Sequence, residues 1–264
     1  MLILIRGAGD LATGVALRLH RCGFSIIMTE LPAPTAVRRT VAFSEALYTG
    51  CTTVEDVTVC RAEDDLAVRA ALQKGVPALI ADPDGTAICR FRPDVVVDAR
   101  IAKRNIDTRI DDAPLVIALG PGFTAGVDCH AVVETMRGHT LGRCIYEGSA
   151  LPNTGIPGNV GGFTKERVLY TPAEGIFHPH RKIGDTVAAG DTVADVDGVP
   201  LPATIGGCLR GLLPEGISIP KGMKAGDIDA RCDVSHCFTV SDKALSIGGG
   251  VLEAILHRRA FGNP

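Results

Sequence analysis

The sequence predicts an α/β protein in which a parallel sheet domain precedes a small all-β module and a C-terminal helix. Three observations favour this class: an opening order of strand, glycine turn, helix and strand, a change to short strands between glycine turns after residue 165, and a helical apolar stripe near the end. We expect a sheet domain over residues 1–150, a Gly/Pro-rich linker or ligand loop over 151–165, the β module over 166–231, and over 232–264 a C-terminal segment whose helix packs back on the first domain.

The first residues carry a motif that is typical of nucleotide binding. Residues 1–6 (MLILIR) form an apolar run of strand length, and residues 7–12 (GAGDLA) follow with the pattern G-x-G-x-x-A. Gly7 lets the chain turn tightly, and Gly9 has no Cβ to hold a pyrophosphate away from the backbone. This order predicts a Rossmann-like parallel sheet domain that binds a nucleotide or dinucleotide. The alternative is a turn whose glycines serve only close packing.

An acidic residue follows this motif at the distance that ribose binding requires. Glu30 ends the second predicted strand, about twenty residues beyond the glycines, where a carboxylate can accept hydrogen bonds from ribose hydroxyls. Arg38 and Arg39 come next and could accommodate a ribose phosphate, so the choice between NAD and NADP stays open. The cofactor-binding residues predicted at this end of the chain are Gly7, Gly9, Asp10 and Glu30.

A second glycine-rich turn follows another buried strand. Residues 115–119 (LVIAL) precede residues 120–126 (GPGFTAG), whose amides, with Thr124, could line an anion pocket. His130 comes shortly after, and the pattern of Val132, Val133 and Met136 suggests a helix. The histidine could act as a general acid or base, or be a structural residue at a helix edge. The predicted cofactor site gains Gly120, Pro121, Gly122 and His130, and no catalytic residue is assigned.

Composition excludes several classes of protein. The 264 residues carry a formal net charge of −3 and a pI near 6.2, which gives no electrostatic footprint for nucleic acid. No apolar run approaches the roughly 18 residues of a membrane-spanning helix, and the apolar start is too short for a signal peptide. We therefore expect a cytoplasmic protein with neither nucleic acid nor membrane as a partner.

Nine cysteines are scattered along the chain without a C-x-x-C motif. In a reducing compartment most of them are expected to be small core residues. Cys232 and Cys237, with His236 beside them, could be read as part of a metal site. Because two cysteines and one histidine do not fill a tetrahedral set, no metal site is predicted, and the role of this pair stays open.

The residues after Glu166 resemble a biotinyl/lipoyl-type flattened barrel. The unit GD-x-V occurs at residues 184–187 and 190–193, and a second quasi-repeat would run over residues 207–228. A carrier domain of this type presents a lysine at the hairpin between the quasi-repeats, whereas residues 196–202 (VDGVPLP) contain none. We therefore expect no covalent biotin or lipoate and a structural or docking role for the module.

Residues 241–259 are expected to close the chain as a helix. Ser241 and Asp242 are candidate caps, and the apolar residues beyond them recur at helical spacing. Residues 248–250 (GGG) interrupt this pattern, so they mark either close packing onto the first domain or a third phosphate-facing turn.

Several segments taken together resemble the YqeB family. The likeness runs over nearly the entire chain and is carried by RGAGDLATGVALRL, MTELPAPTAVRRTVAFSEALY, LGPGFTAGVDCHAVVETMRGHTLGR, PNTGIPG, KAGDIDAR and SDKALSIGGGVLEAIL. The resemblance implies an accessory protein of the selenium-dependent molybdenum hydroxylase system. It also implies a molybdenum hydroxylase apoenzyme as partner, and molybdenum cofactor dinucleotide as a ligand alternative to NAD or NADP. The family's two motifs are matched by Gly7, Gly9, Asp10 and Glu30, and by Gly120, Pro121, Gly122 and His130.

Three functions are compatible with these observations. The first is a nucleotide-binding accessory factor for maturation of a molybdenum hydroxylase. The second is an NAD(P)-dependent oxidoreductase of unknown substrate, for which His130, Lys103 and Tyr48 are candidate proton donors. The third is a non-enzymatic scaffold whose glycine loops only pack. The sequence leaves the ligand, any reaction, direct handling of selenium and the oligomeric state undecided.

Overall fold

The computed structural model describes residues 1–262, so Asn263 and Pro264 of the expected C-terminal segment lie outside the described part. The chain divides into two compact units. The first unit combines residues 1–34, 42–154 and 240 onward, and the second combines residues 35–41 and 155–239. The chain thus passes from one unit to the other inside the Gly/Pro-rich stretch, and residues 232–239 belong with the β module.

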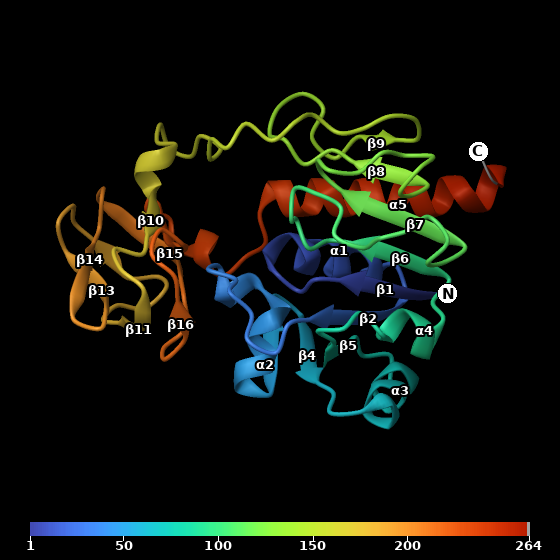
Figure 1. Ribbon diagram of the computed structural model, residues 1–264, viewed down its shortest axis with the longest axis horizontal. Coiled ribbons are helices and arrows are strands. Elements are labelled where there is room, and N and C mark those ends of the chain that lie inside the picture. Colours follow the sequence, from blue (N-terminus) through green and yellow to red (C-terminus); the bar gives the residue numbers. More distant parts are fainter. Residues whose placement is uncertain (263–264) are drawn as a thin grey trace. The chain divides into compact units, whose positions relative to one another are not determined.

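A nine-stranded sheet forms the centre of the first unit (Figure 1). Across the sheet its strands are β3 (Cys51–Val54), β4 (Val57–Arg61), β5 (Ala78–Ala81), β2 (Ser25–Glu30), β1 (Leu2–Arg6), β6 (Val95–Asp98), β7 (Leu115–Leu119), β8 (Ala131–Val133) and β9 (Cys144–Ile145). Strands β1, β6 and β7 lie in the interior of the sheet and are buried along nearly their whole length. Their continuous apolar runs are typical of strands that are covered on both faces.

The expectation of a Rossmann-like parallel sheet is wrong, because the sheet is mixed. Strand β3 runs antiparallel to β4, and β9 runs antiparallel to β8. The connections from β6 to β7 and from β7 to β8 also contain no helix. Between β7 and β8, Gly120, Pro121, Gly122 and Gly126 disfavour a helix over residues 120–130.

The helix expected around Val132 and Val133 is likewise wrong, because these residues form β8. They pair with Ala118 and Leu119 of β7, which the β-branched side chains of the valines favour. The sequence pattern predicted the wrong element because three buried residues cannot distinguish one helical turn from a short strand.

The helices of the first unit are α1 (Asp10–Arg21), α2 (Ala46–Thr49), α3 (Asp65–Gln73), α4 (Ala87–Phe91) and α5 (Asp242–Phe261), with the short 3-10 turn η2 (Phe43–Glu45). The 3-10 turn η1 (Arg39–Val41) belongs to the second unit. Helix α5 packs along α1 (Figure 1). A Cβ on Gly14 would lie 2.5 Å from the Cβ of Ala244, and one on Gly248 would lie 3.0 Å from the carbonyl oxygen of Gly14. Gly248 therefore serves close packing onto α1, within one uninterrupted helix.

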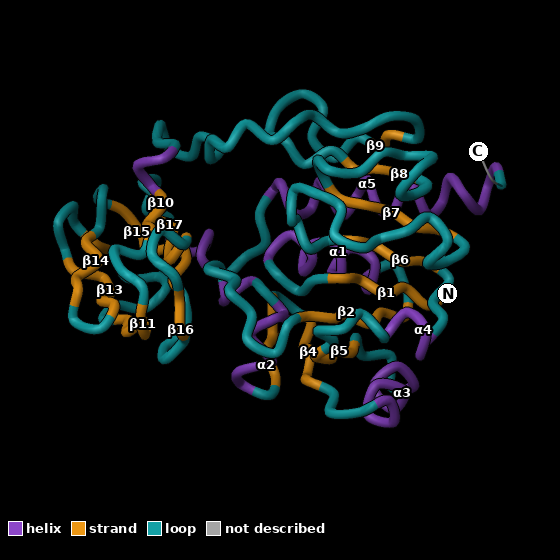
Figure 2. Tube along the Cα trace, in the orientation of Figure 1, coloured by secondary structure: helices purple, strands orange, loops and turns teal. Residues whose placement is uncertain are grey.

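The second unit consists of two four-stranded antiparallel sheets. One contains β10 (Val168–Tyr170), β17 (Lys224–Asp229), β15 (Gly207–Leu212) and β12 (Thr186–Val187), and the other contains β14 (Val199–Pro202), β13 (Thr192–Val196), β11 (Gly175–Pro179) and β16 (Ser218–Ile219). The short turns η3 (Lys165–Arg167) and η4 (Val234–Cys237) flank them. Figure 2 shows these short strands separated by loops.

The two sheets of the second unit share one apolar core, which includes Phe177, Leu209 and Ile228. The expectation of a biotinyl/lipoyl-like barrel is wrong, because the strands form two separate four-stranded sheets whose hydrogen bonds do not join into one closed sheet. The two GD-x-V units form turns, in which the carboxylates of Asp185 and Asp191 accept hydrogen bonds from the backbone three residues earlier. The repeat in the sequence is thus a repeat of turns.

Candidate functional site

The turn between β1 and α1 leaves its backbone open at one position. Gly7 has φ +104, and a Cβ on it would lie 2.9 Å from the carbonyl oxygen of Ala99, so this position requires glycine. Apart from Gly9 itself and its two chain neighbours, no atom lies within 4 Å of the position that a Cβ on Gly9 would take. Gly9 is also the N-cap residue of α1 and makes no side-chain capping hydrogen bond. The amino end of a 12-residue helix is therefore accessible at Gly9.

Glu30 lies against this turn. Its Oε2 accepts a hydrogen bond from the Ala8 amide at 2.9 Å, and its Oε1 accepts one from the Leu31 amide at 2.8 Å. A carboxylate oxygen can accept more than one hydrogen bond, so Glu30 retains capacity for a ligand hydroxyl. The structure thus brings the predicted residues Gly7, Gly9 and Glu30 together at the carboxyl end of β1 and β2.

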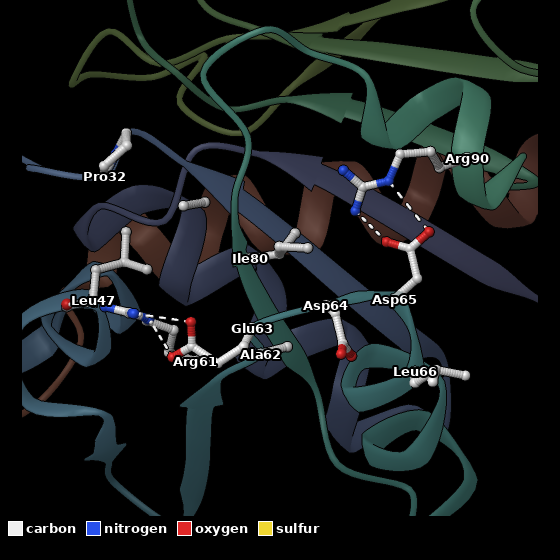
Figure 3. Close-up of a pocket in the computed structure, with 11 residues that line it drawn as sticks. Pro32, Leu47, Arg61, Ala62, Glu63, Asp64, Asp65, Leu66, Ile80 and Arg90 are labelled. Atoms are coloured by element: carbon white, nitrogen blue, oxygen red, sulfur yellow. Dashed lines mark hydrogen bonds and ion pairs between the residues drawn. The ribbon is translucent and has the colours of Figure 1, made fainter.

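A pocket of about 610 Å³ opens beyond the carboxyl ends of β4 and β5 (Figure 3). It is lined by Ala81, which pairs with Glu30 in the sheet, and by Pro32, two residues after Glu30. Ile80 contributes to its apolar wall. Two ion pairs frame the pocket: Arg61 with Glu63, at 2.8 Å between Nε and Oε1, and Arg90 with Asp65. Asp64 also lines the pocket, so its lining combines two guanidinium groups with three carboxylates. A guanidinium group can stack on a planar ring while it remains paired with a carboxylate.

The second glycine turn is filled by other parts of the protein. A Cβ on Gly120 would lie 2.5 Å from Oγ1 of Thr135, and one on Gly122 would lie 2.6 Å from the amide nitrogen of Arg104. Both glycines also have positive φ angles. Gly120 and Gly122 therefore allow the close approach of neighbouring chain, whereas Gly9 faces open space. Pro121, between them, is partly exposed.

His130 lies at the amino-terminal ends of the parallel strands, whereas the Gly7–Gly9 turn lies at their carboxyl ends. It directly precedes β8, and its amide donates to the carbonyl oxygen of Val116 at 2.8 Å. Its Nδ1 accepts a hydrogen bond from the Val116 amide at 3.0 Å. Burial, followed by the positive charge of Arg258, lowers the pKa of His130 below its ordinary value. The structure does not bring His130 to the other predicted site residues.

A cluster of charges near the first turn was missed by sequence reasoning. Lys243, in the first turn of α5, is half-buried, and this burial, with the charges of Arg137 and Lys103, lowers its pKa. Asp10 and Glu134 oppose the shift by favouring the charged form. The sequence carried one signal for this cluster, which is the position of Lys243 in the first turn of the predicted helix. A cation there interacts unfavourably with the helix dipole, so a nearby acidic group is expected to compensate for it.

Glu134 and Arg137 are fixed by their own contacts. Glu134 is 2% exposed, and its two carboxylate oxygens accept hydrogen bonds from the amides of Met136 and Leu151 at 2.7 and 2.8 Å. Arg137 forms a bidentate ion pair with Asp242 at 2.8 and 3.1 Å. Lys243 is therefore surrounded by charges that are held in defined positions.

Three further candidates are engaged elsewhere. Arg38 and Arg39 lie in the second unit, where they donate to the carbonyl oxygens of His236 and Leu212 at 3.2 and 2.9 Å. The hydroxyl of Tyr48 donates to the carbonyl oxygen of Pro34 at 2.7 Å. These contacts are intramolecular, so nothing in them favours a role in recognising a ribose phosphate or donating a proton.

The cysteines depart from the expectation that most are core residues. Cys51 and Cys60 form a disulfide bond across the β3–β4 hairpin, and both are exposed. Among the free cysteines, Cys22, Cys89 and Cys232 are exposed, and Cys129, Cys208 and Cys237 are buried. Within the described part of the chain no three His, Cys, Asp or Glu side chains gather as a metal site. Within residues 1–262 no helix has the length and apolar character needed to cross a bilayer.

Comparison with known proteins extends the family resemblance. No family model matches the sequence. The uncharacterized protein YqeB of Escherichia coli (strain K12) is 49% identical over 255 residues, which is 97% of this chain and 47% of that protein. The chain is similar to this protein over nearly its whole length. It spans about half the length of this curated relative, and the likeness to YqeB supports the family that the motifs indicated.

Similar solved structures have little sequence in common with the chain. An aspartoacylase family protein from Mesorhizobium loti has TM-score 0.27 and 11% identity, with 86% of this chain and 84% of that chain covered. The product-bound ectoine utilization protein EutE (DoeB) from Ruegeria pomeroyi has TM-score 0.23 and 12% identity, with 77% and 57% covered. A succinylglutamate desuccinylase/aspartoacylase from Rhodobacter sphaeroides has TM-score 0.24 and 14% identity, with 77% and 57% covered.

Proposed function

We propose that the first unit binds a phosphate-bearing small molecule at the carboxyl edge of its sheet, and that the protein acts as an accessory factor for maturation of a molybdenum hydroxylase. The observation that carries the binding proposal is the open backbone at Gly9. An accessible helix amino end offers amide donors and a positive dipole to an anion.

The charges near this helix end are mixed, which bears on the ligand's own charge. Asp10 lies in the first turn of α1, and its carboxylate opposes an incoming phosphate. Lys243 provides a compensating cation, and its charge interacts with that of Asp10. The site therefore suits a ligand whose phosphate contacts the backbone at Gly9 while Lys243 offsets the carboxylate.

The pocket beyond β4 and β5 suits the remainder of such a ligand. Glu30 contacts the Gly9 turn through the Ala8 amide, and its strand partner Ala81 and the nearby Pro32 line the pocket. A volume of about 610 Å³ falls in the range of small-molecule sites. The arrangement supports a ligand with phosphate, hydroxyl and ring parts, and NAD, NADP and molybdenum cofactor dinucleotide are the candidates.

The maturation role rests on the resemblance to the YqeB family, with a molybdenum hydroxylase apoenzyme as the proposed partner. Binding of a phosphate-bearing cofactor is compatible with this role, because an accessory factor would hold the cofactor before the apoenzyme receives it. We assign no catalytic residue, since His130 lies at the other edge of the sheet and Tyr48 contacts Pro34.

The binding proposal is tested by calorimetric titration of the full chain with pyrophosphate, ATP, CTP, NAD, NADP and molybdopterin cytosine dinucleotide. Gly9 has φ −68 and ψ −176, which any residue adopts, so Gly9→Val should fold and place its side chain over the helix end. We expect about tenfold weaker binding or more, a loss of about 1.4 kcal/mol. Gly249→Ala is the matched control, because it is another glycine with open space around it.

Binding with equal affinity by Gly9→Val and the unaltered chain would remove the glycine turn from the site. Absence of heat with every probe at millimolar concentration would end the proposal of phosphate binding.

The maturation role needs a separate measurement. A molybdenum hydroxylase is purified from cells that contain or lack the protein, and its molybdenum content and activity are compared. We expect both to fall in the absence of the protein and to be restored by the Gly249→Ala variant. Unchanged molybdenum content and activity would reject this role and leave the binding proposal standing.

A further inference from the structure

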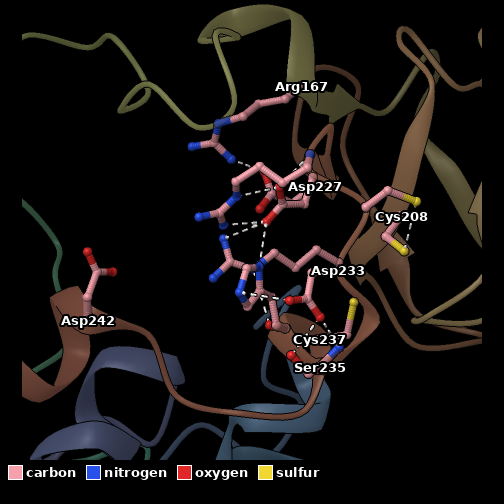
Figure 4. A network of polar contacts seen from close by, with 12 residues as sticks. Arg167, Cys208, Asp227, Asp233, Ser235, Cys237 and Asp242 are labelled. Carbon is pink, nitrogen blue, oxygen red and sulfur yellow. Dashed lines mark hydrogen bonds and ion pairs between the residues drawn. The ribbon is translucent and has the colours of Figure 1, made fainter.

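The second unit contains two thiols in contact, which the proposed function does not use (Figure 4). The Sγ atoms of Cys208 and Cys232 are 3.3 Å apart. Cys208 lies on β15, and Cys232 follows β17, 24 residues later. The Thr186 hydroxyl lies 3.8 Å from the Cys232 sulfur.

The backbone around both thiols is fixed by the β15–β17 pair. Cys208 is directly opposite Asp229 in this antiparallel ladder. The Asp229 carboxylate, whose side chain is fully buried, accepts hydrogen bonds from the amide of Arg231 at 3.1 Å and from its guanidinium at 2.9 and 2.6 Å. These bonds hold the turn that carries Cys232 beside the strand that carries Cys208, so the contact between the sulfurs is imposed by the fold.

The two thiols differ in their access to solvent. Cys232 is exposed, whereas Cys208 is buried. Burial, followed by its hydrogen bond with Cys232, raises the pKa of Cys208 to about 11. Because thiolates are the attacking species in thiol–disulfide exchange, Cys208 is a poor first nucleophile at neutral pH. A reagent from solution would therefore meet Cys232 first.

We propose that Cys208 and Cys232 form a reversible disulfide bond by exchange with a low-molecular-weight disulfide such as oxidised glutathione. The Cys232 sulfur, after losing its proton to solvent, attacks one sulfur of the reagent and expels one glutathione thiolate. Cys208 then loses its proton and attacks the Cys232 sulfur, which releases the second glutathione. Two protein thiols are oxidised, and one external disulfide is reduced to two thiols.

Other cysteines are distinguished from this pair by position. Cys51 and Cys60 are already joined and belong to the first unit. Cys237 is buried, and its sulfur lies 3.8 Å from the carbonyl oxygen of Leu209. The exposed free thiols Cys22 and Cys89 therefore serve as internal controls for simple surface reactivity.

The test equilibrates the full chain in graded mixtures of reduced and oxidised glutathione, quenches it with acid, alkylates the remaining thiols and maps the peptides by mass spectrometry. We expect a linked Cys208–Cys232 peptide, lighter by two hydrogens than the separate peptides, that forms and disappears reversibly along the series. Cys22 and Cys89 should carry single glutathione adducts in the most oxidising mixtures.

Two variants identify the order of the steps. Cys208→Ser should leave a stable glutathione adduct on Cys232, and Cys232→Ser should leave Cys208 reduced. If Cys208→Ser does not fold, the Cys232→Ser variant, altered at an exposed position, still decides the matter. Absence of the linked peptide at every ratio, glutathione remaining on Cys232 in the unaltered chain, or oxidation of Cys208 in Cys232→Ser would each overturn the proposal.

Discussion

The two glycine turns of the first unit follow similar strands but have opposite surroundings. The turn after β1 leaves open space over Gly9, whereas the turn after β7 is filled by Arg104 and Thr135 at the positions where Gly122 and Gly120 lack side chains. A glycine can thus exist to admit a ligand or to admit neighbouring chain. The contrast explains why two motifs that look alike in the sequence support one candidate ligand site.

The same contrast separates the residues expected to act together. Glu30 joins the open turn through its hydrogen bond with Ala8, whereas His130, expected beside the filled turn, pairs with Val116 at the other edge of the sheet. In a parallel sheet, residues that precede a strand lie at the amino-terminal ends of the strands, and residues that follow a strand lie at the carboxyl ends. His130 precedes β8, so closeness to residues 120–126 in sequence did not make it a neighbour of the carboxyl edge.

The largest expected effect is the loss of stability in Gly122→Ala. The new Cβ would overlap the backbone of Arg104, and the residue has φ +102, which an alanine adopts only with strain. We expect the free energy of unfolding to fall by about 3 kcal/mol or more, measured by urea denaturation. A loss below about 1 kcal/mol would show that the second turn is also open and would remove the contrast.

A smaller change is expected in Lys243→Met, which removes the cation that interacts with Asp10. Methionine retains most of the packing volume, so the fold should persist while the affinity for pyrophosphate falls about tenfold. Calorimetric titration measures this loss at low and high salt, and the difference from the unaltered chain should shrink as salt screens the charges.

The control for Lys243→Met is Lys74→Met, a lysine exposed at the end of α3. Equal losses in the two variants would mean that net charge, and not the position of Lys243, governs binding.

The pH dependence of stability tests the place of His130. Its folded-state pKa lies below the ordinary value of 6.5, so on acidification the unfolded chain takes up the proton before the folded chain does. The free energy of unfolding should therefore fall as pH decreases from about 6.5 to the lowered pKa. Replacement of His130 by Gln should flatten this part of the profile, measured by denaturation at several pH values, and should leave pyrophosphate affinity unchanged. A lower affinity in the variant would return His130 to the ligand site.

The smallest effect on stability is expected in Gly9→Ala. The backbone at this position is extended, and no atom beyond the adjacent residues lies within 4 Å of the added methyl group. The free energy of unfolding should therefore change by less than about 1 kcal/mol. Measured together with Gly122→Ala, this variant gives the stability loss expected for a substitution in the open turn. A large loss in Gly9→Ala would mean that chain packs over the first turn.

The sequence predicted those elements that local pattern specifies. The apolar runs at residues 1–6 and 115–119 form β1 and β7, and Ser241 caps α5 by accepting a hydrogen bond from the Ala244 amide at 3.2 Å. It failed for β8, for the second turn and for the biotinyl/lipoyl-like barrel, where partners distant in sequence decide the outcome. It also missed Lys243, whose neighbours Asp10 and Glu134 lie far away along the chain.

The sequence by itself determined where strands, turns and helices could begin, because apolar spacing, glycine and capping residues act over a few neighbouring positions. Only the tertiary structure decided which glycine turn stays open, because that depends on whether Arg104 and Thr135 occupy the space beside it. The contact between Cys208 and Cys232 has the same origin, since the pairing of β15 with β17 brings together thiols that no spacing rule connects.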